Sequence, residues 1–72
     1  MRTQMAGVEQ GKNGKWAVSF DTFLGLPGAE YLANTATSAP VFETEDEALI
    51  GGARALTRLE ETGRFPNMCE KF

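Results

Sequence analysis

The stretch from Thr44 to Gly63 constrains the fold most, because it carries signals for a helix start, an amphipathic body and a helix end. The Thr44 hydroxyl can cap the first turn, and Glu47 can reach back to the cap amide in a capping box. Gly63 suits the left-handed residue that ends many helices, and Pro66 follows soon after. The sequence therefore predicts one long helix over this stretch.

This helix is predicted to be amphipathic. A step of about 100° per residue places small and apolar residues on one side, namely Ala48, Leu49, Gly52, Ala53, Ala55, Leu56 and Leu59. Gly52 on this side should let the helix approach its neighbours closely. Gly51 falls on the opposite, charged side, where it should cost about 1 kcal/mol relative to alanine. The rest of the chain must cover the apolar side.

Three segments before the helix have the composition of strands: Thr3–Gln10, Lys15–Phe23 and Glu30–Ala36. The segment Val41–Glu43 is a candidate for a short fourth strand. An antiparallel sheet whose consecutive strands are joined by short turns, with one C-terminal helix packed on one face, follows from this order. The predicted fold class is therefore α+β.

Two turns set the strand register. A three-residue loop ending at a left-handed Gly14 would pair Val8 with Val18 and Ala6 with Phe20, so that the apolar faces agree. The sequence Leu-Pro-Gly-Ala at residues 26–29 suits a type II turn, with glycine at its positive-φ position.

The composition is that of one small domain spanning residues 1–72, in which 42% of residues are hydrophobic. We expect seven residues to be buried together, namely Trp16, Val18, Phe20, Leu49, Ala53, Leu56 and Leu59. The tail, residues 64–72, either packs back on the domain or stays flexible. No apolar run is long enough to cross a membrane, and a lone Cys69 is typical of a reducing compartment, so we expect a cytoplasmic protein.

The residues needed for common catalytic chemistry are missing. The chain contains no histidine, and the single cysteine has no evident partner to lower its pKa. We therefore predict no catalytic, cofactor-binding or metal-binding residues, and an enzyme is the least favoured class. The net charge of −3 also disfavours a nucleic-acid partner, because such proteins usually carry an excess of lysine and arginine.

Candidate binding residues remain on the predicted surface. Glu43, Glu45 and Asp46 concentrate negative charge at the helix start, where they either only stabilise the helix dipole or also attract a basic partner. Leu24 and Leu26 lie in a predicted loop, and Ile50 lies on the helix side away from the core. These apolar residues either form a contact site or extend the core. We predict that a protein partner contacts the acidic residues together with Leu24, Leu26 or Ile50.

The layout of residues 16–55 resembles the arm-type DNA-binding domain of phage tyrosine recombinases. The resemblance rests on Trp16 in an early strand and on the junction Phe-Glu-Thr-Glu-Asp-Glu-Ala at residues 42–48. It implies a three-stranded antiparallel sheet followed by one helix, with DNA bound through the sheet. That family presents lysine and arginine on the sheet, whereas the outward positions of the second strand here are Ala17, Ser19 and Asp21.

Two functional hypotheses follow. The first is a non-enzymatic module that binds a larger protein, since small phage accessory proteins, including inhibitors of bacterial defence complexes, are similarly short and acidic. The second is a nucleic-acid-binding domain of the arm type. A steep loss of affinity with salt would distinguish the second from the first.

Overall fold

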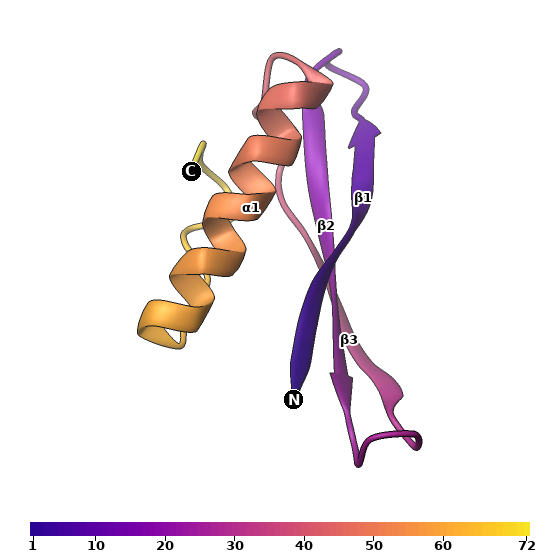
Figure 1. Ribbon diagram of the computed structural model, residues 1–72. Coiled ribbons are helices and arrows are strands. Elements are labelled where there is room, and N and C mark those ends of the chain that lie inside the picture. The colour runs from indigo at the N-terminus through magenta and orange to yellow at the C-terminus, as the bar shows by residue number, and fades with distance from the viewer.

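Three antiparallel strands in the order β1-β2-β3 precede one helix in the computed structural model, which describes residues 1–72 (Figure 1). The elements are β1 (Arg2–Gln10), β2 (Trp16–Leu24), β3 (Tyr31–Thr37) and α1 (Glu45–Thr62). The α+β class is confirmed, and each strand lies within one residue of its predicted bounds. The candidate fourth strand is reduced to a single bridge, in which Trp16 and Phe42 exchange backbone hydrogen bonds of 2.7 and 3.1 Å.

Both ends of α1 are where the sequence predicts them. Thr44 has an extended backbone, and its hydroxyl accepts a 3.1 Å hydrogen bond from the Glu47 amide. Gly63 has a φ of 74° and donates its amide to the Leu59 carbonyl at 2.8 Å. The return bond of the capping box differs by one residue, because the Glu47 carboxylate accepts from the Glu43 amide at 3.2 Å.

The register of β1 and β2 agrees with the prediction near their turn and departs from it further along. Val8 faces Val18, as expected. A bulge between Met5 and Gly7 then shifts the pairing, so that Met5 and not Ala6 faces Phe20. The extra residue lets the longer Met5 side chain pack against the core while Ala6 stays exposed.

The helix face that packs on the sheet is rotated from the predicted one. Its buried residues are all small: Ala48, Gly51, Gly52 and Ala55. Leu49 and Ala53 are exposed, so their predicted places in the core are wrong. Gly51, predicted to be exposed, is buried because a Cβ atom there would lie 2.6 Å from the Phe42 ring. Gly52 is on the packing face as expected, where a Cβ atom would lie 2.9 Å from Met5 and Val18.

The core forms between the sheet, α1 and the residues on either side of α1. Its fully buried members are Val18, Phe20, Phe42, Ala48 and Ala55. Of the other residues predicted in the core, Trp16, Leu56 and Leu59 are half-buried. The small residues of α1 thus leave space that aromatic rings from other segments fill.

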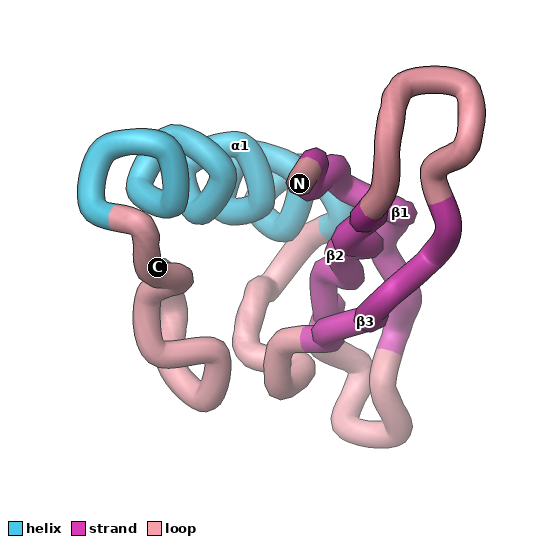
Figure 2. Tube along the Cα trace, turned by 90° about the horizontal axis from the view of Figure 1, so that it is seen from below, coloured by secondary structure: helices cyan, strands magenta, loops and turns pink.

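The tail, residues 64–72, turns back along α1 (Figure 2). Its Phe65 ring packs 5.1 Å from that of Phe20, and its Phe72 ring packs edge-on 5.2 Å from that of Phe42. The Met68 carbonyl accepts a 2.8 Å hydrogen bond from the Ala39 amide. The tail therefore belongs to the packed domain.

The β2–β3 hairpin projects past the end of α1, because α1 packs on β1 and β2 and not on β3 (Figure 1). The turn at its tip is tight. Ala29 donates its amide to the Leu26 carbonyl at 2.8 Å, and Gly28 has a φ of 83°, as a type II turn requires.

Candidate functional site

The segment from Leu24 to Leu32, here called the hairpin arm, holds four of the seven large apolar side chains that are exposed: Leu24, Leu26, Tyr31 and Leu32. Leu26 is 76% exposed and Tyr31 is 60% exposed. Single exposed apolar residues are ordinary, but a group of them on one projecting element marks a contact surface. The hairpin arm is therefore the main candidate for a binding site.

The base of the hairpin arm is held by the start of β1. The Arg2 guanidinium lies 4.6 Å from the centre of the Phe23 ring and 3.4 Å from the Glu30 carboxylate. Beside it, the hydroxyls of Thr3 and Thr22 are 3.0 Å apart. These contacts fix the direction of the arm while leaving its leucines uncovered.

The acidic helix start is partly used in local structure. The Glu43 carboxylate lies 3.3 Å from the Lys15 ammonium, and the Glu47 carboxylate lies 3.2 Å from that of Lys71. The hydrogen bond from Lys71 and then the one from the Glu43 amide lower the pKa of Glu47 below its ordinary value. Glu45 and Asp46 make no ion pair. Their charge is therefore free to act on a partner.

The structure divides the predicted site into two groups. The helix start and the tip of the hairpin arm lie at opposite ends of a molecule 39 Å long (Figure 1). Ile50, which is 53% exposed, lies one helical turn after Asp46 and so stays with the acidic group. Leu24 and Leu26 lie at the other end, because β2 runs the length of the sheet between the two groups.

Tyr31 and Leu32 are binding candidates that the sequence prediction placed only in a strand. A signal for one of them was present, because neighbouring residues of a strand point to opposite faces of the sheet. One of two adjacent large apolar residues must therefore lie away from the helix-covered face. The exposure of the other results from the short reach of α1, which does not touch β3.

The outer face of the sheet is polar. The register places Arg2, Glu9 and Asp21 on it, which gives one cation against two carboxylates. The Thr35 hydroxyl donates to Asp21 at 3.0 Å, and the hydroxyls of Ser19 and Thr37 are also 3.0 Å apart. These side chains bond to one another, and the face lacks the basic character of the arm-type domains.

No family model, curated protein or solved structure matches this chain. No group of three or more histidine, cysteine, aspartate or glutamate side chains is placed to hold a metal ion. α1 does not combine the length and the apolar character that a membrane-crossing helix requires. The argument for function therefore rests on the surface of the domain.

Proposed function

We propose that this protein is a small non-enzymatic module that binds a larger protein by inserting its hairpin arm into an apolar groove. The supporting observation is the group of four exposed apolar side chains on an element that projects past the helix. One concrete form of this function is a phage or mobile-element accessory protein that inhibits a host nucleic-acid-handling or defence complex by occupying its surface.

The chemistry of the hairpin arm favours an apolar partner surface. Its only charged residue is Glu30, and Arg2 pairs with that carboxylate. Full burial of a leucine side chain is worth about 1.5–3 kcal/mol, so a few such anchors can supply most of an interface's affinity. Leu26 is the most exposed of the four and lies in the turn at the tip. It is the anchor that we expect to matter most.

The unpaired carboxylates of Glu45 and Asp46 have a different role in this proposal. They lie at the far end from the arm, so they act on a partner large enough to span the domain. Charges at the rim of an interface mainly change the rate of encounter, whereas buried anchors mainly change the rate of escape. Reversing both residues to lysine should slow association, and Leu26→Ala should speed dissociation.

The arm-type alternative receives no support from the outer sheet face. A duplex DNA partner requires cations placed against its phosphates, and this face has more carboxylates than cations within its strands.

Affinity capture from a bacterial lysate, followed by mass spectrometry, tests the proposal when wild type is compared with two variants. The double variant Leu26→Ser with Tyr31→Ser should lose the protein that wild type captures. Ile50→Ser removes an exposed side chain at the other end and should retain that protein. All three side chains are exposed, so melting temperatures should agree and exclude unfolding. Loss with Ile50→Ser alone would move the site to the helix start, and equal capture by all three proteins would overturn the proposal.

A further inference from the structure

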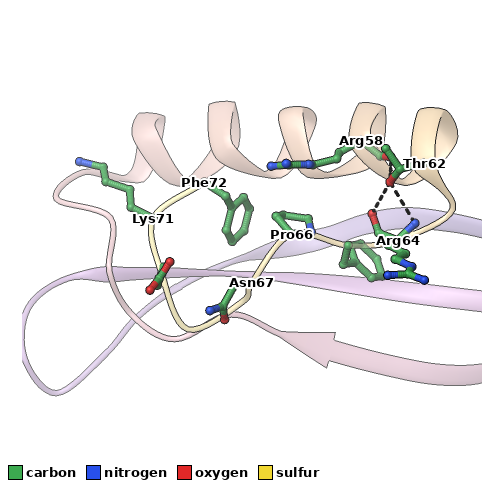
Figure 3. Close-up of a pocket in the computed structure, with 9 residues that line it drawn as sticks. Arg58, Thr62, Arg64, Pro66, Asn67, Lys71 and Phe72 are labelled. Carbon is green, nitrogen blue, oxygen red and sulfur yellow. Dashed lines mark hydrogen bonds between the residues drawn. The ribbon is translucent and has the colours of Figure 1, made fainter.

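A cavity of about 530 Å³ lies between the second half of α1 and the tail (Figure 3). Its volume is within the usual range for small-molecule sites of about 300–1,000 Å³. Three of the chain's seven cationic side chains line it: Arg58, Arg64 and Lys71. We propose that this cavity binds a small planar monocarboxylate, whose carboxylate is held by Arg58 and Arg64 and whose body packs on Phe65 and Phe72.

Two of the three cations are free to bind a ligand. Lys71 points away from the other two and pairs with Glu47 at 3.2 Å (Figure 3). Arg58 and Arg64 make no ion pair, although the chain has ten acidic residues. A guanidinium presents a planar fork of donors that matches the two oxygens of a carboxylate. The two arginines therefore supply unsatisfied donors for an anion.

The other lining groups define the rest of the ligand. Asn67 uses its side-chain oxygen to accept from the Cys69 amide at 3.0 Å, which leaves its amide nitrogen free to donate. The rings of Phe65 and Phe72 are held in place by Phe20 and Phe42, so the apolar wall of the cavity is preformed. Such a wall suits a flat, apolar body beside the anionic group.

The charge of the lining favours a single negative charge on the ligand. Glu70 is the one carboxylate side chain in the lining, and it forms no ion pair with either arginine. With Lys71 counted as neutralised by Glu47, two arginines and one glutamate leave one positive charge. A monocarboxylate matches this charge, whereas a phosphate dianion exceeds it.

Benzoate is a suitable probe because it is a planar monocarboxylate. We would titrate the isotope-labelled full chain with sodium benzoate and follow backbone amide shifts by NMR, with sodium chloride at equal ionic strength and with inorganic phosphate as comparisons. Saturable shifts are expected with benzoate at Arg58 and across residues 62–72. Phosphate should shift the same amides more weakly.

The variants make the test specific. Arg58→Gln and Arg64→Gln should each weaken benzoate binding about tenfold or more, as expected for loss of a charged contact worth at least about 1.4 kcal/mol. Arg54→Gln is the matched control, because Arg54 is another unpaired arginine of α1 but does not line the cavity. Shifts that chloride reproduces, affinities that all three variants share with wild type, or tighter binding of phosphate would each overturn the proposal. None of these outcomes depends on the hairpin arm.

Discussion

The ring of Phe42 occupies the space that a side chain at Gly51 would need, with two ring carbons 2.6 Å from the Cβ position of that residue. Phe42 is buried, and the edge-on ring of Phe72 restricts its movement further. The carbonyl oxygen of Phe72 also lies 3.2 Å from the same Cβ position. Gly51 therefore lets α1, the sheet-side ring and the tail meet at one point.

Gly51→Ala should destabilise the protein by about 1–2 kcal/mol. The added methyl group would overpack the core at a cost of about 1–3 kcal/mol, and the gain of about 1 kcal/mol in helix propensity offsets only part of it. Urea unfolding measures the change. Combining the substitution with Phe42→Leu should recover part of the Gly51→Ala loss. A stabilised Gly51→Ala protein would show that Phe42 does not pack there.

Leu56→Ala and Leu49→Ala distinguish the observed orientation of α1 from the predicted one. Leu56 packs against the core and should cost about 2–3 kcal/mol on truncation, near the low end for leucine because it is only half-buried. Leu49 is 39% exposed and should cost less than about 1 kcal/mol. Equal costs in urea unfolding would contradict this orientation.

Thr44→Ala should lower the free energy of unfolding by about 1 kcal/mol, because the Glu47 amide loses its hydroxyl acceptor. Thr44→Ser keeps a hydroxyl and should stay within a few tenths of a kcal/mol of wild type. Thermal unfolding followed by circular dichroism gives both values. An alanine variant that melts with wild type would remove the case for this cap.

Acid should weaken the contact between α1 and the tail. The pKa of Glu47 is lowered in the folded protein, chiefly by its hydrogen bond with Lys71. Its contribution to stability is therefore present above the ordinary value of 4.5 and is lost as the pH falls below it. Glu47→Gln should flatten that part of the curve of stability against pH. Glu60→Gln, which removes a carboxylate without an ion pair, should leave the curve unchanged.

Local sequence determined the ends of α1, the strand bounds and the register beside the first turn. Each depends on residues a few positions apart. Thr44 and Glu47 form the cap, and Gly63 ends the helix through its own backbone conformation. A loop ending at Gly14, which has a φ of 82°, sets Val8 against Val18. Residues so close in the chain contact one another whenever the local structure forms.

Tertiary packing decided which side of α1 is buried, which residues fill the core and how far apart the candidate binding groups lie. Periodicity placed Leu49 inside and Gly51 outside, but the rings of Phe42 and Phe72 approach α1 from other segments and reward the smallest residue instead. The leucines of the hairpin arm are exposed because α1 stops short of β3. Such contacts join residues distant in sequence, and the space available to each side chain exists only once the segments have packed.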